Sequence, residues 1–240
     1  MRTLTKLYTG ETTKIAFLGA STTDGAEAGF WWSDRSLTYR GRVLTGIPEL
    51  IPGAQVFEIS TAIHKGGTTS EVGMQMIKDY VIPHRNDLCL IAFGGNDVAG
   101  PLNGAPNVAP WTFSRLIRDM VDTLQQENID VILVTLYPHH SFYQTHVQRI
   151  PQYCDTLRKI AQDMNVGLAD INIEWENMAT HGIPPHSMLH NNHNHPGVDG
   201  HKVMADVILR FFDPQYNGIV NRENFSNQNP NLPFVVSLNP

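Results

Sequence analysis

Five short apolar runs recur along the chain, and they constrain the fold more than any other feature of the sequence. They span residues 14–18, 55–60, 87–93, 130–136 and 166–171. Each run is rich in aliphatic and β-branched residues and is bounded by turn formers, which is typical of strands. Because the runs are continuously apolar, both faces of each strand are expected to be covered, as in a parallel sheet.

Helical patterns separate these strands. Apolar residues repeat at helical spacing over 113–124, 157–164 and 203–211. Strands that alternate with helices predict a three-layer α/β/α sandwich with a mainly parallel five-stranded sheet and right-handed crossovers. In such sheets ligands bind beyond the carboxyl ends of the strands, so the residues that follow each strand are the candidates for function.

Length and charge narrow the class of protein. A chain of 240 residues can bury one large core, and residues 1–212 are expected to form it. Residues 213–240 are rich in Asn and Pro and are interpreted as an irregular C-terminal extension. The net charge is −6 without any basic run, which argues against nucleic acid and anionic membranes as partners. Cys89 and Cys154 lie in apolar patterns and are expected in the core.

The sequence leaves the cellular setting open. No N-terminal stretch has the basic-then-apolar form of a signal peptide, and no apolar run is long enough to span a bilayer. A cytoplasmic protein, a mature secreted protein and a virion component are all compatible with these observations.

Four motifs follow the predicted strands or precede the last helix. "GASTTDG" surrounds Ser21, "HKGGTTS" begins at His64, "GGND" begins at Gly94, and "HNNHNHPGVDGH" spans residues 190–201. Each motif alone is common in loops. Together and in this order they resemble the blocks of the SGNH (GDSL-type) hydrolase family over roughly residues 14–212, which implies an SGNH/flavodoxin-like sheet.

The resemblance implies a serine esterase that needs no cofactor. Ser21 is expected to be the nucleophile and His195 the base that takes its proton. The tetrahedral oxyanion needs preorganised donors, which are expected to be the backbone N–H groups of Ser21 and Gly66 and the side-chain amide of Asn96. Gly67 replaces Gly66 if the register differs by one residue.

One position departs from the family pattern. An Asp normally stands three residues before the catalytic His, and here that residue is Asn192. An Asn can orient an imidazole but supplies no charge to stabilise the imidazolium. Three alternatives stay open: a Ser–His dyad oriented by Asn192 or a backbone carbonyl, substitution by Asp199 or Asp24, or a weakened domain that acts as a carbohydrate-binding module.

The histidines near the C-terminal motif suggest an alternative function, that of a metal-dependent hydrolase. His190, His193 and His195 include an H-x-H pair that can ligate zinc in a metal-dependent hydrolase. No H-E-x-x-H motif or cysteine pair accompanies them, so the serine esterase is the preferred interpretation. His139, His140, His146 and His181 are interpreted as incidental.

The expected substrate is an ester of a small acyl group, most simply acetyl, on a carbohydrate. Long apolar lid helices are not visible in the sequence, which argues against large lipids. Trp31, Trp32 and Tyr39 follow the nucleophile motif and are candidates for a sugar-stacking surface. The alternative is that these rings belong to the core.

Overall fold

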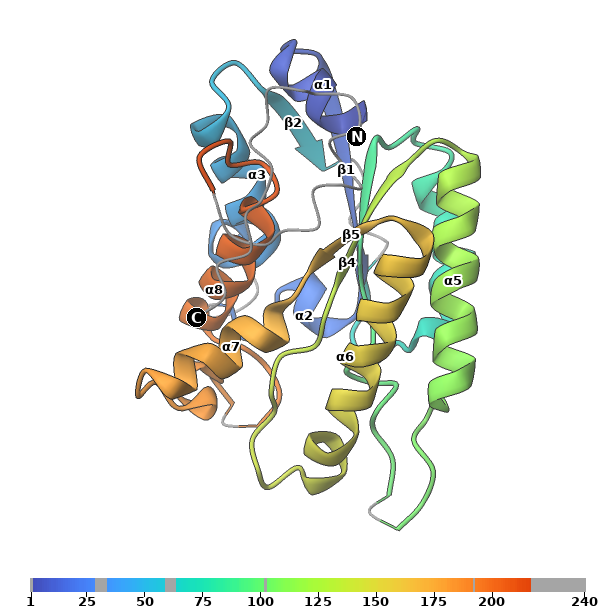
Figure 1. The fold of residues 1–240 in the computed structure, drawn as a ribbon, viewed down its shortest axis with the longest axis vertical. Coiled ribbons are helices and arrows are strands. Elements are labelled where there is room, and N and C mark those ends of the chain that lie inside the picture. The colour runs from blue at the N-terminus through green and yellow to red at the C-terminus, as the bar shows by residue number, and fades with distance from the viewer. Residues whose placement is uncertain (1, 29–33, 59–63, 102, 192, 217–240) are drawn as a thin grey trace.

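The computed structural model describes residues 2–28, 34–58, 64–101, 103–191 and 193–216 (Figure 1). At its centre lies a parallel sheet of five strands in the order β2-β1-β3-β4-β5. The strands are β1 (Thr12–Gly19), β2 (Gln55–Glu58), β3 (Leu88–Ala92), β4 (Asp130–Val134) and β5 (Gly167–Ala169). Each falls within or overlaps one of the apolar runs, so the predicted sheet is confirmed.

Helices cover both faces of this sheet. They are α1 (Arg2–Tyr8), α2 (Ser21–Asp24), α3 (Tyr39–Leu50), α4 (Gly73–Met76), α5 (Pro110–Gln126), α6 (Gln144–Met164), α7 (Ile171–Thr180) and α8 (Val198–Leu209). The periodic segments correspond to α5, α6 and α8. The sequence pattern did not predict α3, which contains Gly41, Gly46 and Pro48, all weak helix formers.

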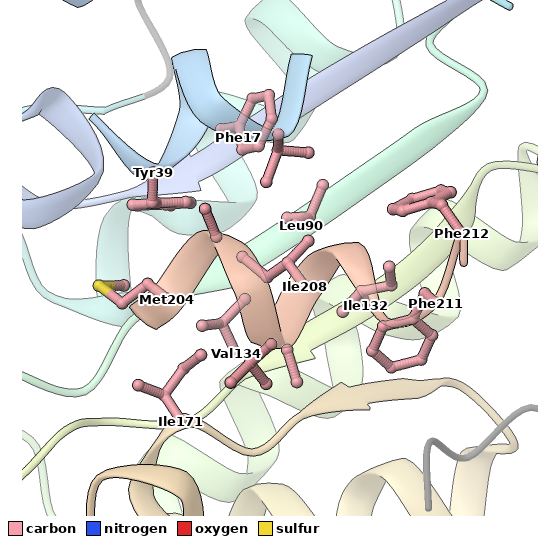
Figure 2. Close-up of a cluster of buried hydrophobic side chains, with 14 of the residues drawn as sticks. Phe17, Tyr39, Leu90, Ile132, Val134, Ile171, Met204, Ile208, Phe211 and Phe212 are labelled. Carbon is pink, nitrogen blue, oxygen red and sulfur yellow. The ribbon is translucent and has the colours of Figure 1, made fainter. Parts of the chain in front are cut away.

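Successive residues of the central strands enter two different cores. Ile15 and Phe17 of β1 pack in the core on the side of α3, α7 and α8, whereas Ala16 and Leu18 pack in the core on the side of α5 and α6. Figure 2 shows part of the first core, where residues of the sheet meet α8; it includes Phe17, Leu90, Ile132, Val134, Met204 and Ile208. This two-sided burial explains why the strands read as continuous apolar runs.

Three smaller sequence predictions can be compared with this structure. Cys89 and Cys154 are free thiols buried in the core, as predicted. Tyr39 is fully buried at the start of α3, so its assignment to a sugar-stacking surface is wrong. Its ring packs edge-on against Phe17 in the core. Trp31 and Trp32 lie outside the described residues.

The division between a domain of residues 1–212 and a C-terminal extension of residues 213–240 stays a prediction. Phe211 and Phe212 follow α8 and are buried in the core, while residues 217–240 lie outside the described part of the chain. Among the described helices, none has both the length and the apolar character that crossing a membrane requires.

The strand order changes direction at β1. β2 lies on one side of this strand and β3 on the other, so the chain connections diverge there. Ligands of open α/β sheets bind at this switch point, beyond the carboxyl ends of the strands. The segments that follow β1 and β3 therefore form the candidate site.

Candidate functional site

A tight turn between β1 and α2 positions Ser21. A Cβ atom at Gly19 would lie 2.2 Å from Thr23 Oγ1 and 2.9 Å from the carbonyl oxygen of Ala92, so the turn requires glycine. Ser21 is consequently the first residue of α2. The backbone N–H at that position has no acceptor within the helix and is free to face a ligand.

His195 faces this serine from the loop that precedes α8. Its Nε2 atom lies 2.8 Å from Ser21 Oγ, a hydrogen-bonding distance. Burial lowers the pKa of His195 below its usual value, and the nearby Glu27 carboxylate opposes that shift. An imidazole within hydrogen-bonding distance of a serine hydroxyl is one requirement of nucleophilic catalysis by serine.

The other ring nitrogen of His195 contacts Asn191. The Nδ2 amide of Asn191 lies 2.9 Å from His195 Nδ1. Asn192, the residue predicted for this role, lies outside the described residues. Asn191 was missed because the family pattern directed attention to the next position. The sequence signal that could have found Asn191 is local: an Asn at the start of a short polar turn commonly accepts hydrogen bonds from the backbone N–H groups of the residues that follow it.

A small cavity opens beside the Ser21 and His195 side chains. Its volume is about 50 Å³, which holds only a few water-sized groups. Its lining includes Ala20, Ser21, Thr22, Ala92, Phe93, Gly95, Asn96, Val134, Thr135, Leu136, Tyr137, His139, Asn194, His195 and Met204. The lining thus combines apolar side chains with polar ones, as small-molecule sites do.

Two of the predicted oxyanion donors border this cavity or the serine. Asn96 lines the cavity, and its Nδ2 donates one hydrogen bond to the carbonyl oxygen of Thr68 at 2.9 Å. That bond orients the amide and leaves its second N–H available to donate to a ligand in the cavity. A Cβ atom at Gly66 would lie 3.8 Å from Ser21 Cβ, whereas one at Gly67 would meet nothing within 4 Å. The geometry therefore favours Gly66 over Gly67 as the neighbour of the serine.

The two alternative acids are not brought to His195. Asp24, the last residue of α2, accepts a hydrogen bond from His64 Nδ1 at 2.9 Å. Asp199 lies in the first turn of α8, and the described contacts include none between it and His195. His64 also lies 3.7 Å from Glu58. The carboxylates on this side of α2 thus gather around a different histidine.

The predicted zinc alternative lacks a ligand set within the described residues. No group of three or more His, Cys, Asp or Glu side chains there is arranged to hold a metal ion. His190 instead pairs through Nδ1 with Glu27. The His193 ring lies against the ring of Tyr143, with centroids 5.4 Å apart.

Tyr137 is a site residue that the sequence analysis missed. Its hydroxyl donates to the carbonyl oxygen of Asn194 at 2.6 Å and lies 2.8 Å from Thr22 Oγ1. It therefore ties the loop that carries His195 to the helix that begins at Ser21. His139, which was interpreted as incidental, lines the cavity, and burial lowers its pKa to about 3.

The fold and the contact between Ser21 and His195 have the form of a serine hydrolase with an α/β/α sheet. A family model described as the GDSL-like lipase/acylhydrolase family matches residues 17–203. The chain belongs to that family and is accordingly a carboxylic ester hydrolase.

Solved structures agree with this fold. An acetyl-xylooligosaccharide esterase mutant from Geobacillus stearothermophilus is similar with a TM-score of 0.68 and 20% identity, covering 83% of this chain and 94% of its own. The acetylxylan esterase Axe2 from that organism has a TM-score of 0.68 and 20% identity, and the match covers 82% of this chain and 93% of Axe2. LAE5, an α/β hydrolase from the metagenome of Lake Arreo, Spain, has a TM-score of 0.69 and 20% identity, and the match covers 82% of this chain and 93% of LAE5. The comparison with curated proteins found no match.

Proposed function

We propose that this esterase removes short acyl groups, most simply acetyl, from a carbohydrate. Ser21 attacks the ester carbonyl, His195 accepts the serine proton, and the oxyanion is bound by the N–H groups of Ser21 and Gly66 and the amide of Asn96. The observation that carries the proposal is the 2.8 Å contact between Ser21 Oγ and His195 Nε2 beside the cavity.

The cavity supports the short acyl group. Its volume of about 50 Å³ matches a short acyl group better than a fatty acyl chain. Its apolar lining residues suit the methyl end of an acetyl group, and its polar lining residues suit the ester oxygens.

The surface beside the cavity supports a carbohydrate alcohol. Phe142 is 83% exposed, and its ring stacks on His140 with centroids 4.8 Å apart. Phe142 and Tyr143 border a groove of about 320 Å³. The ring of Tyr143 also contacts the ring of His193, two residues before His195, and this contact links the groove to the site. Exposed aromatic rings of this kind offer flat apolar surfaces for sugar rings.

Replacement of the proposed nucleophile tests the proposal. Ser21→Ala should abolish hydrolysis of p-nitrophenyl acetate without unfolding the protein, and a serine-directed phosphonate should label Ser21. Ser187→Ala is the matched control, because it removes an exposed serine hydroxyl that donates to the carbonyl oxygen of Pro184, and this variant should still be labelled at Ser21. Undiminished turnover by Ser21→Ala would overturn the nucleophile assignment, and a protein that binds acetylated oligosaccharide without Ser21-dependent turnover would be a binding module.

Substrate series test the two halves of the ester. Turnover should fall steeply from p-nitrophenyl acetate to butyrate and octanoate, because longer chains exceed the cavity. Phe142→Ala should raise KM for an acetylated xylo-oligosaccharide and leave KM for p-nitrophenyl acetate unchanged. Equal turnover of octanoate and acetate would contradict the acyl assignment.

A further inference from the structure

The orientation of the Asn191 side chain is fixed by its oxygen. Asn191 Oδ1 accepts three backbone hydrogen bonds, from the N–H groups of His193 at 2.9 Å, Asn194 at 3.0 Å and His195 at 3.1 Å. An NH₂ group at that position would face three donors without an acceptor. The network therefore assigns oxygen and nitrogen of this amide without ambiguity.

The nitrogen of the same amide faces two acceptors. Asn191 Nδ2 lies 3.0 Å from Asn194 Oδ1 and 2.9 Å from His195 Nδ1. Its two hydrogens are thus both used, and Nδ1 receives one of them. A nitrogen that accepts a hydrogen bond carries no proton, so a neutral His195 holds its proton on Nε2.

That tautomer is the wrong one for a base. Ser21 Oγ lies 2.8 Å from Nε2, the atom that must accept the serine proton. When Nε2 carries the proton, it donates to Ser21 Oγ and has no lone pair to offer. The serine is then hydrogen-bonded but not activated.

We propose that Asn191 is a positioning residue that holds His195 in the Nε2–H tautomer, so that the resting site is kept in an unreactive state. The proposal rests on the proposed function, because it concerns the same serine and histidine. Turnover then comes only from the minority of molecules in which Asn191 releases Nδ1. The observed rate is the rate of the competent molecules multiplied by their fraction.

Neither simple rearrangement restores the base at low cost. A proton moved to Nδ1 would point at the N–H of Asn191. A rotation of the amide by 180° would offer an oxygen to Nδ1 but would place NH₂ against the three backbone N–H groups. Release therefore requires the turn from Asn191 to His195 to change its hydrogen bonds.

The charged and titratable groups around His195 do not replace the missing acid. Glu27 acts on His195 from a distance and pairs with His190. His139 and His201 also interact electrostatically with His195, and burial lowers the pKa of each. Both are therefore neutral at pH 7 and supply no negative charge to an imidazolium.

A carboxylate at position 191 would complete the catalytic arrangement. It would accept the three backbone N–H groups and also Nδ1–H, which leaves the lone pair on Nε2. As Ser21 Oγ bonds to the ester carbon, its proton moves to Nε2 and the carbonyl electron pair moves to the oxygen. Collapse of the intermediate breaks the bond to the alcohol oxygen, which takes the proton from Nε2.

The test is Asn191→Asp, with Asn194→Asp as the matched control. Asn191→Asp should raise kcat for p-nitrophenyl acetate by roughly 10²–10⁴-fold, since the reverse change in a serine protease costs about 10⁴. KM should change little. Asn194→Asp adds the same charge to the same turn but leaves the Asn191 amide on Nδ1, so it should not reproduce the gain.

Two further readouts separate this role from a merely structural one. The ¹⁵N NMR signals of the His195 ring in the unmodified protein should show Nδ1 unprotonated and Nε2 protonated, and Asn191→Asp should reverse them. The acidic limb of the kcat/KM profile should move to higher pH in Asn191→Asp, because a carboxylate raises the pKa of His195.

The outcomes distinguish this inference from the proposed function. An Nδ1–H signal in the unmodified protein would overturn the inference even if no variant folds. An unchanged kcat in folded Asn191→Asp, together with loss of activity in Ser21→Ala, would overturn the inference and leave the proposed function intact. Activity that survives Ser21→Ala in both backgrounds would overturn the proposed function itself.

Discussion

Two histidines flank the short helix α2, and their partners differ in charge. At the helix start, His195 contacts the Ser21 hydroxyl on one ring nitrogen and the Asn191 amide on the other. At the helix end, His64 contacts the Asp24 carboxylate at 2.9 Å, with Glu58 at 3.7 Å. The histidine with acidic partners is thus not the one that touches the proposed nucleophile.

The difference separates a structural role from a chemical one. Glu58 also accepts from Arg40 at 2.5 Å, and His64 forms a backbone bridge to Gly19, so this side of α2 is a buried, cross-linked support. A buried ion pair such as Arg40–Glu58 is costly to break by removing one partner. On the Ser21 side, His195 lies between the Ser21 hydroxyl and the Asn191 amide, so a proton can be exchanged between Ser21 Oγ and His195 Nε2.

Exchange of the two histidines for alanine gives the largest expected contrast. His195→Ala should lower kcat by roughly 10²–10⁴-fold, because it removes the proposed base. His64→Ala should keep kcat within about tenfold but lower the free energy of unfolding by about 1–3 kcal/mol, because the buried His64 side chain and its hydrogen bond to Asp24 are lost. Esterase kinetics and urea unfolding of both variants measure this contrast.

A result in the opposite sense would break the comparison. If folded His64→Ala loses as much kcat as His195→Ala, then the acidic side of α2 takes part in the chemistry. The Asn191→Asp background sharpens the test, since the loss caused by His195→Ala should be larger there than in the unmodified chain.

Asn96 tests the chemical side from another direction. Asn96→Ala should lower kcat by roughly 10²–10³-fold with less change in KM, because the oxyanion exists only in the transition state. Asn107→Ala is a suitable control, since Asn107 Nδ2 donates to the backbone carbonyl of Asn96 and the variant keeps the Asn96 amide itself. An effect of Asn96→Ala confined to KM would mean that Asn96 binds the ground-state substrate instead.

The sheet could be predicted because its pattern is local and repeated. Each strand is buried on both faces, so each appears as an apolar run that needs no knowledge of its neighbours. Helix α3 could not be predicted in this way, because tertiary packing of Val43 and Ile47 overrides the weak propensity of its Gly and Pro residues.

The site was only partly predictable for a related reason. Ser21, Asn96 and His195 follow strands or precede a helix at family spacing, and the structure brings them to one cavity. Asn191 and Tyr137 could not be found from spacing, because their roles depend on hydrogen bonds across the turn from 191 to 195 and between that turn and α2. Such bonds leave no periodic signal in the sequence.

His201 gives the smallest expected effect and sharpens the comparison, since its two ring nitrogens contact only backbone groups. Nδ1 accepts from the N–H of Tyr39 at 3.1 Å, and Nε2 lies 3.4 Å from the carbonyl oxygen of Ala26. Burial lowers the pKa of His201 to about 4, whereas an unfolded histidine has a pKa of about 6.5. The unfolded state therefore binds the proton first as pH falls.

The sign of the pH dependence follows from these two values. The stability that His201 contributes is complete above about pH 6.5 and is lost as the pH falls toward 4, at about 1.4 kcal/mol per pH unit. Between pH 7.5 and 5 the loss is about 2 kcal/mol. His201→Gln keeps one acceptor and one donor but does not titrate, so its free energy of unfolding, measured in urea, should fall less over this range. His139, with a pKa lowered to about 3, contributes equally to both proteins and cancels in the difference. Parallel pH profiles for the two proteins would show that His201 is protonated alike in the folded and unfolded states.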